Sequence, residues 1–209
     1  MTVDSSTGRL TQRERRERTE SALITAAAEL VVESGLRSLT LAGVGERAGY
    51  SRGIVNHHFG SKQALVEALA LATQSGFVPG MDGREPGLDR LLALVDGYVG
   101  KLAEVGVTNR AFLVLWAEAS TAPELTETFR RRDEAFRSDL RADVAAGIAA
   151  GTVRPEADPD DVAVAIVGQL RGIGLQRLLD GDAVNTERLR RTVADHWRRA
   201  LSTEDPTRR

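Results

Sequence analysis

The sequence predicts an all-α protein of about nine helices, with a three-helix helix-turn-helix domain followed by a larger helical C-terminal domain. Apolar residues recur every three to four positions through most of the 209 residues, which is the spacing of one helix face. The sequence has no pair of alternating segments joined by a tight turn, the pattern that indicates a β-hairpin. The third observation is a pair of capping residues on either side of a glycine turn in the front third of the chain.

Breaks rich in glycine, proline or serine separate the expected helices. The first long helix is expected to end at Gly35, and the Pro/Gly-rich stretch 79–87 is the expected joint between domains. The other breaks are 49–51, 60–61, 105–107, 120–123, 151–159 and 181–185. The apolar positions with helical spacing are Leu23, Ala27, Leu30 and Val31, then Leu88, Leu91, Leu92, Val95, Val99 and Leu102, then Leu125, Phe129, Phe136, Leu140 and Val144, and finally Leu189, Val193, Trp197 and Leu201.

The segment Val162–Val167 has six consecutive apolar residues and could be a buried strand. However, Asp158 can cap a helix, and Pro159 suits the first helical position. A lone strand would also have no pairing partner in an otherwise helical chain. We therefore expect a helix that is apolar on every side and buried on several of them.

Composition narrows the classes of function. The chain has no cysteine, which excludes disulfide scaffolds, zinc ribbons and thiol catalysis. Its N-terminus is polar and no apolar run reaches the roughly 18 residues of a membrane-spanning helix, so we expect a cytoplasmic protein with no membrane contact. The net charge is −2, yet residues 1–62 hold nine Lys and Arg against seven Asp and Glu. This mild excess permits an anionic partner for the front third.

The most informative segment is TLAGVGERAGYSRGIVNHHF, which starts at Thr40. Thr40 can cap a helix over Leu41–Ala48, and Gly49 supplies a left-handed turn residue. Ser51 can then cap a second short helix. Two helices of about two turns joined by three or four residues form a helix-turn-helix. The residues expected to face inward are Leu41, Val44, Ala48, Val55 and Phe59, with Ala48 small enough for a close crossing of the two helices.

The remaining side chains of the second helix are expected on its outer side or at its entry turn. Arginine, asparagine and histidine can contact phosphates and base edges, and glycine permits a close approach. These outward residues are Arg52, Gly53, Ile54, Asn56, His57 and His58.

The same residues resemble the DNA-binding domain of the TetR-type transcriptional regulators. Sequences of that family commonly have the pattern T-x-x-x-I-A-x-x-A-G-V-S-x-G-T-L-Y-x-H-F-x-S-K-x-x-L after a long first helix. The resemblance covers about residues 12–66. It implies a homodimer that binds a double-stranded DNA operator and responds to an unknown small-molecule effector. The matching residues are Thr40, Val44, Ala48, Gly49, Ser51, Gly53, Val55, His58, Phe59, Ser61, Lys62 and Leu65.

The resemblance also implies roles for individual residues. Arg52 and His57 occupy positions where base contacts are usual, whereas Thr40, His58 and Lys62 occupy positions of phosphate contacts. The predicted DNA-binding set is therefore Thr40, Arg52, Gly53, Asn56, His57, His58 and Lys62. The chain departs from the family pattern at four positions. Asn56 stands where the family usually has Tyr, Ile54 where it has Thr, Tyr50 where it has Val, and Gly45 where it has Ala. Asparagine has less reach than tyrosine, so its contact could be an adenine edge instead of a phosphate.

Two patterns also have a simpler interpretation. His57 and His58 diverge by about 100° on a helix and have only His196 as a third histidine, so DNA contact is favoured over a metal site. The four arginines between positions 13 and 18 could form an arm that reaches DNA. They could equally form a solvated face, because glutamates are interleaved with them and Glu14 and Arg18 have favourable i,i+4 spacing.

The later helices carry the predicted dimer interface. Gly168, Gly172 and Gly174 interrupt the apolar helix and cost about 1 kcal/mol each relative to alanine, which suggests that something packs closely there. We favour a partner helix across a two-fold axis, with packing inside the same chain as the alternative. The predicted interface residues are Ile166, Leu170, Leu175, Leu178, Val193 and Trp197.

Four of the nine aromatic residues, Phe112, Trp116, Phe129 and Phe136, lie on two consecutive expected helices. By spacing alone, such a stripe is more often core than pocket. The family resemblance implies instead that these helices enclose an effector cavity. The stretch from Phe112 to Phe136 resembles the effector domain of the choline/betaine-type branch, without identifying the effector. The predicted ligand-binding residues are Phe112, Trp116, Phe136, Arg110 and Gln169, with Glu118 and Arg171 as further polar candidates.

Three functions are compatible with these residues. The first is a ligand-responsive DNA-binding repressor, with its DNA-binding domain at 10–62 and its ligand-binding and dimerisation domain at 63–203. The second is a helical small-molecule enzyme or carrier, but the sequence shows no metal set, no nucleophile with a base and no cofactor loop. The third is a constitutive DNA binder without an effector. The sequence favours the first function, without enzymatic activity, metal or cofactor.

Overall fold

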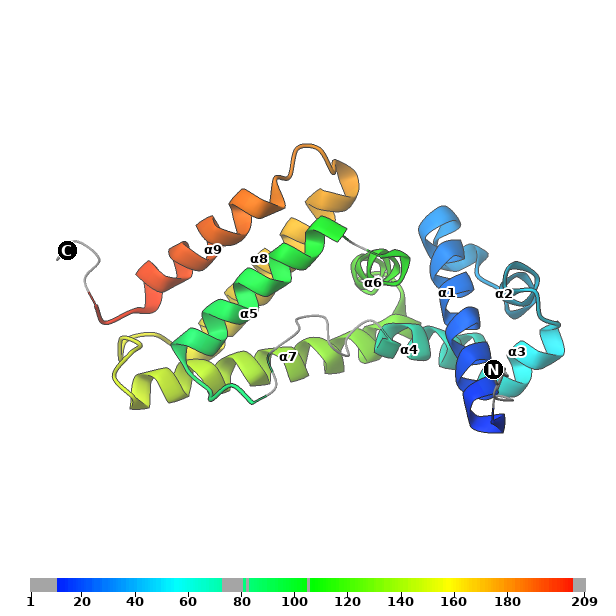
Figure 1. Cartoon of the computed structure of the whole chain (residues 1–209), viewed down its shortest axis with the longest axis horizontal. Helices are drawn as coiled ribbons and strands as arrows, with labels where there is room; N and C mark the ends of the chain where they lie inside the picture. The colour runs from blue at the N-terminus through cyan, green and yellow to red at the C-terminus, as the bar shows by residue number, and fades with distance from the viewer. Residues whose placement is uncertain (1–10, 73–80, 82, 105, 205–209) are drawn as a thin grey trace, which may run out of the picture.

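The computed structural model describes residues 11–72, 81, 83–104 and 106–204 (Figure 1). Within these residues every regular element is helical, apart from one isolated β-bridge between Val153 and Ser202. The predicted all-α class is confirmed. The α-helices are α1 (Gln12–Ser38), α2 (Leu41–Ala48), α3 (Arg52–Phe59), α4 (Lys62–Ala72), α5 (Leu88–Lys101), α6 (Val107–Glu118), α7 (Pro123–Ala149), α8 (Pro159–Leu179) and α9 (Thr186–Leu201), with a short 3₁₀ turn at Leu102–Glu104.

Local capping explains where the long helices begin. At the start of α1, the Thr11 hydroxyl accepts a hydrogen bond from the Glu14 amide at 3.2 Å, and the Glu14 carboxylate accepts one from the Thr11 amide at 2.7 Å. At the start of α8, the Asp158 carboxylate accepts from the amides of Asp160 and Asp161. The apolar segment that follows is helical, as predicted, because its first turn is capped in this way.

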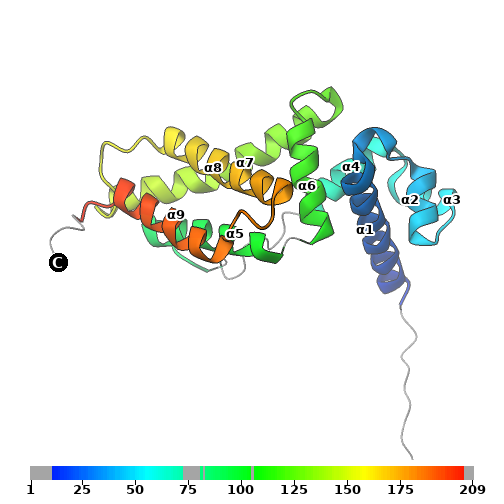
Figure 2. The same cartoon turned by 90° about the horizontal axis from the view of Figure 1, so that it is seen from above.

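Two hydrophobic cores follow one another along the molecule (Figures 1 and 2). The first core joins α1–α4 to α6 and to the first turns of α7, and includes Leu23, Leu65 and Leu115. The second core joins α5, the rest of α7, α8 and α9 around residues such as Leu91 and Ile166. α6 makes most of the contact between α1 and the later helices. This helix is therefore the main structural link between the front helices and the rest of the chain.

Among the described helices, α8 alone is long and apolar enough to cross a membrane. Its buried face contains Ile166 and Leu170, which are both fully buried inside the second core. Gly174 lies so close to α6 that a Cβ added there would be 3.0 Å from the methyl groups of Leu113. These contacts show that α8 is apolar because it is a core helix of the fold.

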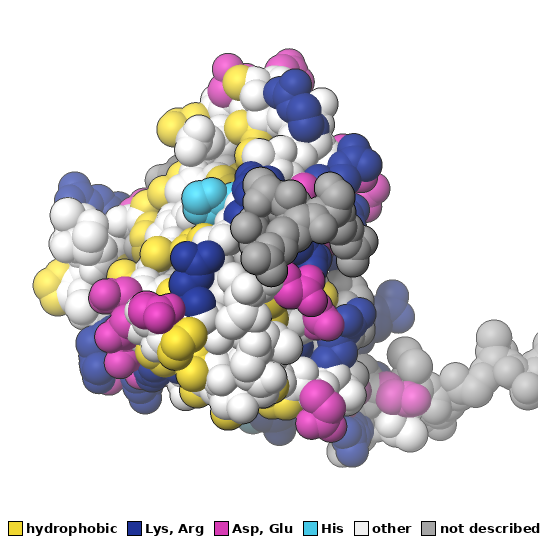
Figure 3. Space-filling view, turned by 90° about the vertical axis from the view of Figure 1, so that its left-hand side faces the viewer, with side chains coloured by type: hydrophobic (Ala, Val, Ile, Leu, Met, Phe, Trp, Pro, Cys, Tyr) yellow, Lys and Arg dark blue, Asp and Glu magenta, His cyan; other side chains and the backbone are white. Residues whose placement is uncertain are grey.

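The front helices α1–α3 lie at one end of the long axis, and the ends of α7 and α9 lie towards the other (Figure 1). Figure 3 views the molecule from that second end. Basic, acidic and apolar side chains are interspersed over this surface, and none of the three kinds dominates it. Long-range attraction of DNA needs a field of one sign. The described side chains of this end therefore form no surface of one sign that would attract DNA.

Candidate functional site

The helix-turn-helix forms over the predicted residues, with α2 at Leu41–Ala48 and α3 at Arg52–Phe59. Thr40 caps α2, since its hydroxyl accepts a hydrogen bond from the Gly43 amide at 3.0 Å. Gly49 ends α2 with φ 74° and ψ 27°, a left-handed conformation that glycine adopts without strain. The Ser51 hydroxyl then caps α3. Local hydrogen bonds therefore fix both helices and the turn between them.

The close crossing of α2 and α3 occurs at Gly45, which corrects the prediction of Ala48. A Cβ added at Gly45 would lie 2.7 Å from the Tyr50 carbonyl oxygen and 3.2 Å from Val55 Cγ2. The Tyr50 amide also donates to the Gly45 carbonyl at 2.8 Å. Ala48 is only partly buried. Gly45, one of the departures from the family pattern, is therefore a packing residue at this crossing.

The outer face of α3 presents polar side chains to solvent. Arg52, Asn56 and His57 are exposed, and their side chains make no hydrogen bond or ion pair within the described part of the chain. Gly53 is exposed beside them, whereas Val55 points inward and is fully buried. Free donors and acceptors next to a glycine suit contact with phosphates and base edges.

The other residues of the predicted DNA-binding set are partly committed to the fold. Lys62 Nζ donates to the carbonyl oxygen of Leu36, near the end of α1, at 2.7 Å. The Thr40 hydroxyl caps α2, and His58 is partly buried with its ring centroid 6.1 Å from that of Phe59. An ammonium has three N–H donors and a hydroxyl keeps its own O–H. Lys62 and Thr40 can therefore contact DNA only in addition to these structural bonds.

Arg47 positions α2 in a way that the sequence analysis missed. Its guanidinium pairs with Glu33 at 2.7 Å and with Glu29 at 3.2 Å, and both carboxylates belong to α1. The acidic pair at i,i+4 spacing on one face of the first helix was the available signal, because like charges at that spacing repel each other unless a cation lies between them. Arg47 thus ties the helix-turn-helix to α1.

The ion pairs in the charged first turns of α1 differ from the predicted ones. The carboxylate of Glu14 accepts from the amide and hydroxyl of Thr11, instead of pairing with Arg18. The ion pair at i,i+4 spacing is instead Arg13 with Glu17, at 2.8 Å. The predicted Glu14–Arg18 pair is therefore wrong, because capping of the helix start engages Glu14 first.

The predicted aromatic residues do converge, where α5, α6 and α7 meet. Phe112 is 6% exposed, and its ring centroid lies 5.4 Å from that of Phe129. Phe136 stacks on Tyr98 with ring centroids 6.4 Å apart. Trp116 and Phe136 are only partly buried. Phe112 and Phe129 are therefore packed as core, whereas Trp116 and Phe136 keep part of their surface exposed.

Two arginines are buried among these rings. Arg171 of α8 is 3% exposed and donates to the Tyr98 hydroxyl at 2.6 Å and to the Asp133 carboxylate at 3.2 Å. The other oxygen of Asp133 accepts from Trp116 Nε1 at 2.7 Å. Arg132 of α7 is 6% exposed, and none of its guanidinium nitrogens has a hydrogen-bond partner among the described residues. Desolvation by burial, together with the Arg171 charge, lowers the pKa of Arg132 to about 10.

We refer to Arg132, Asp133, Arg171 and Tyr98 as the buried arginine cluster. Arg171 was a candidate from the sequence, whereas the other three residues were not predicted. Arg132 and Asp133 lie between Phe129 and Phe136 at helical spacing, so they share the inward face of α7. That spacing was a usable signal, although a run of charges usually marks a solvated face.

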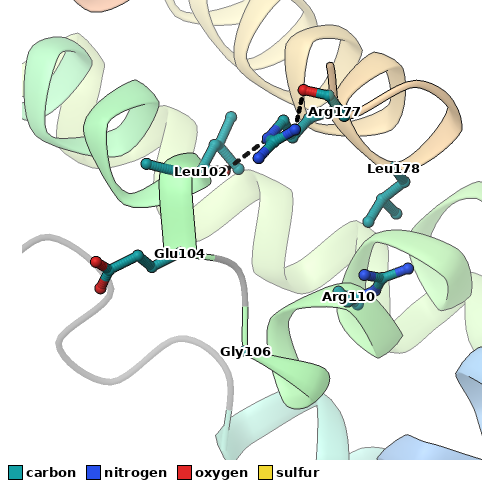
Figure 4. A pocket seen from close by; sticks show the side chains of 8 residues that line it. Leu102, Glu104, Gly106, Arg110, Arg177 and Leu178 are labelled. Carbon is teal, nitrogen blue, oxygen red and sulfur yellow. Dashed lines mark hydrogen bonds between the residues drawn. The ribbon is translucent and has the colours of Figure 1, made fainter. Parts of the chain in front are cut away.

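The other two predicted ligand residues have different contacts from those of this cluster. Gln169 accepts a hydrogen bond from Trp197 Nε1 of α9 at 2.7 Å. Arg110 is exposed and lines a cavity of about 530 Å³ at the junction of α6, the end of α8 and the 3₁₀ turn (Figure 4). Arg177 lies across this junction and donates to the Leu102 carbonyl at 3.3 Å. The residues that line this cavity include Arg110 but neither Gln169 nor Phe112.

The predicted dimer residues are mainly core residues of the subunit, which corrects that set. The side chains of Ile166, Leu170, Val193 and Trp197 are at most 8% exposed and pack inside the second core. Leu175 and Leu178 are partly buried against the first core. These side chains were expected at an intersubunit contact because apolar character alone does not show which helix covers a side chain.

A different stripe of α8 is open. Val164 and Leu179 are 58% and 87% exposed. A Cβ added at Gly168 or Gly172 would have no neighbour within 4 Å, whereas Gly174 packs against its own chain. The three glycines of α8 therefore divide between an outward stripe and an intrachain contact.

Comparison with known families identifies both halves of the chain. Residues 23–69 match the family described as bacterial regulatory proteins, tetR family. Residues 87–202, more than half of the chain, match the family described as BetI-type transcriptional repressor, C-terminal. The HTH-type transcriptional regulator BetI of Ectopseudomonas mendocina is 27% identical over 182 residues, which cover 84% of this chain and 90% of that relative.

Solved structures share the whole fold. A TetR transcriptional regulator from Chloroflexus aurantiacus is 25% identical, with a TM-score of 0.75 over 90% of this chain and 98% of its own. A transcriptional regulator from Saccharomonospora viridis in complex with choline is 17% identical, with a TM-score of 0.73 over 90% of this chain and 100% of its own. With both domains matched in order, the chain belongs to the TetR family of bacterial regulators, in its BetI-type branch, and is a DNA-binding transcriptional regulator.

Proposed function

We propose that this regulator is a repressor that binds a palindromic operator as a homodimer in the cytoplasm and leaves it when a small molecule binds. The outer face of α3 carries the proposal, because the side chains of Arg52, Asn56 and His57 are exposed and make no hydrogen bond or ion pair with the described residues. Reading of base edges needs such free donors and acceptors on a helix held in place by its caps. Residues 10–62 would bind DNA, and residues 63–203 would bind the effector and dimerise.

The dimer would form through the open stripe of α8, with α9 beside it. Gly168 and Gly172 leave room for a partner helix to approach closely. Val164 and Leu179 supply apolar surface that dimerisation would bury. A two-fold axis at this stripe would present two copies of α3 to one side of the DNA, about 34–36 Å apart.

α6 would connect the effector site to the DNA-binding face. It carries Phe112 and Trp116 on one part of its surface and packs along α1 on another. α1 in turn holds α2 through the ion pair of Glu33 with Arg47. A displacement of α6 would therefore reach the helix-turn-helix through packed elements. A coupling free energy of about 1–3 kcal/mol changes operator affinity by roughly 5- to 150-fold, which is sufficient for regulation.

The direct test is a fluorescence-anisotropy titration of the full-length protein against the DNA upstream of its own gene and a scrambled duplex of equal length. We expect Arg52→Ala to lose about 1–3 kcal/mol of binding free energy on the operator and to relax base preference at one position per half-site. Arg131→Ala changes an exposed arginine of α7, so it serves as the control and is expected to bind like wild type. Equal operator binding by the Arg52 variant would contradict the assigned role of α3.

A further inference from the structure

The buried arginine cluster has two positive charges and one negative charge. Arg132 and Arg171 are 6% and 3% exposed. Within the described residues, Asp133 is the one carboxylate that forms an ion pair with either guanidinium. Both oxygens of Asp133 are engaged, one by Arg171 and the other by Trp116. Since a buried charge without a partner is strongly unfavourable, the cluster lacks one anion.

Arg132 has the geometry to receive that anion. All three of its guanidinium nitrogens are buried without a hydrogen-bond partner in the described chain, and so is Nε of Arg171. A guanidinium offers N–H donors in a planar fork, which matches the two oxygens of a carboxylate. The Arg132 guanidinium lies 5.5 Å from the centroid of the Phe112 ring, so packing already orients it. The unsatisfied groups are all donors, and they require an acceptor.

The aromatic rings do not favour a cationic ligand here, even though aromatic faces generally attract cations. The Arg171 guanidinium lies 4.8 Å from the Phe112 centroid, 5.6 Å from that of Phe136 and 5.8 Å from that of Tyr98. The chain therefore supplies its own cations to these rings. A quaternary ammonium such as choline, bound in the Saccharomonospora viridis regulator, would add a third positive charge to this cluster.

We propose that Arg132 binds the carboxylate of a small organic acid with an apolar body, and that this acid is the effector of the repressor function proposed above. The partly buried rings of Trp116 and Phe136 would supply apolar surface for the body of the acid. Since Phe112 and Trp116 belong to α6, the acid acts on the helix that contacts α1.

The test compares acids with their uncharged amides on the full-length protein. The acids are acetate, butyrate, hexanoate, octanoate, benzoate and phenylacetate, each paired with its amide, and choline is the cationic probe. Binding is measured by calorimetry and by the shift in Tm, without DNA. We expect at least one acid to bind about 10- to 100-fold more tightly than its amide, which is the effect of a hydrogen bond to a charged group. Choline is expected not to bind.

Two variants locate the effect. Arg132→Met is expected to abolish the preference for acids over amides and, because it removes an unpaired buried charge, to raise the Tm of the ligand-free protein. Arg131→Met, which changes the exposed neighbouring arginine, is the matched control and keeps the preference. The proposal is overturned if no acid is preferred over its amide in wild type, or if Arg132→Met keeps the preference, lowers the ligand-free Tm or fails to fold.

Operator binding is measured in parallel to separate this inference from the proposed function. The preferred acid, at saturation, is expected to weaken operator binding of wild type and of the Arg131 control by about 5- to 150-fold. If the ligand-free protein binds no DNA sequence specifically, the repressor function is refuted. Intact operator binding with no preference for any acid would refute only the organic-acid effector.

Discussion

Replacing Asp133 with asparagine removes the negative charge that pairs with the buried arginine cluster. Asp133 accepts a hydrogen bond from Arg171 at 3.2 Å and from Trp116 Nε1 at 2.7 Å. Asparagine has nearly the same shape and keeps one carbonyl oxygen, so the bond from Trp116 can persist. The ion pair is lost, and two guanidiniums then lie close together without the carboxylate.

The size of the effect follows from the burial of the pair. Removing one partner of a fully buried ion pair costs about 3–5 kcal/mol. The Asp133 side chain is 13% exposed, and Arg171 keeps its bond to the Tyr98 hydroxyl, so the loss is somewhat smaller. We expect Asp133→Asn to lower the free energy of unfolding by about 2–4 kcal/mol. At about 2–4 °C per kcal/mol for a chain of this size, Tm falls by about 4–16 °C.

The assay is urea and thermal unfolding followed by circular dichroism, at a fixed protein concentration because dimerisation contributes to stability. Asp139→Asn is the control, since Asp139 is exposed on the same helix, and its expected effect is within about 0.5 kcal/mol. Adding Arg132→Met to Asp133→Asn is expected to recover part of the loss, because one of the two buried positive charges is removed. A loss below about 1 kcal/mol for Asp133→Asn, or no recovery in the double variant, would refute the electrostatic account.

Three further predictions concern the DNA-binding domain and the dimer. Gly45→Ala gains about 1 kcal/mol of helix propensity but places a Cβ 2.7 Å from the Tyr50 carbonyl oxygen, at a packing cost of about 1–3 kcal/mol. Urea unfolding is expected to show a net loss of up to about 2 kcal/mol, and a gain in stability would contradict the crossing at Gly45. Val164→Glu places a charge on the open stripe of α8, and sedimentation velocity is expected to show monomers; unchanged dimers would place the interface elsewhere. Lys62→Ala loses the bond to the Leu36 carbonyl, about 1 kcal/mol of stability, and is expected to weaken operator and scrambled DNA alike with a salt slope smaller by about one. Selective loss on the operator alone would instead indicate a base contact.

The sequence by itself determined the features that depend on neighbouring residues. Thr40 and Gly49 define the limits of α2, and Ser51 begins α3, because caps and left-handed turns satisfy backbone groups within about four positions of themselves. In the same way, Asp158 indicated that the apolar segment after it is a helix and not a strand. The burial of Phe112 and Phe129 was also predictable, since both belong to strongly periodic helices.

Only the tertiary structure decided which side chains the helices bury against one another. Ile166 and Trp197 are apolar and looked like contacts to a partner, yet they lie in the core of their own subunit. Gly45 is the residue at the close crossing of α2 and α3, because the Tyr50 carbonyl, which lies outside α2, occupies the space beside it. Arg132 belongs to a run of charges that is typical of a solvated surface, and its burial depends on rings contributed by another helix. Apolar periodicity shows which face of a helix is buried. Which helix covers that face is set by contacts between residues far apart in the sequence.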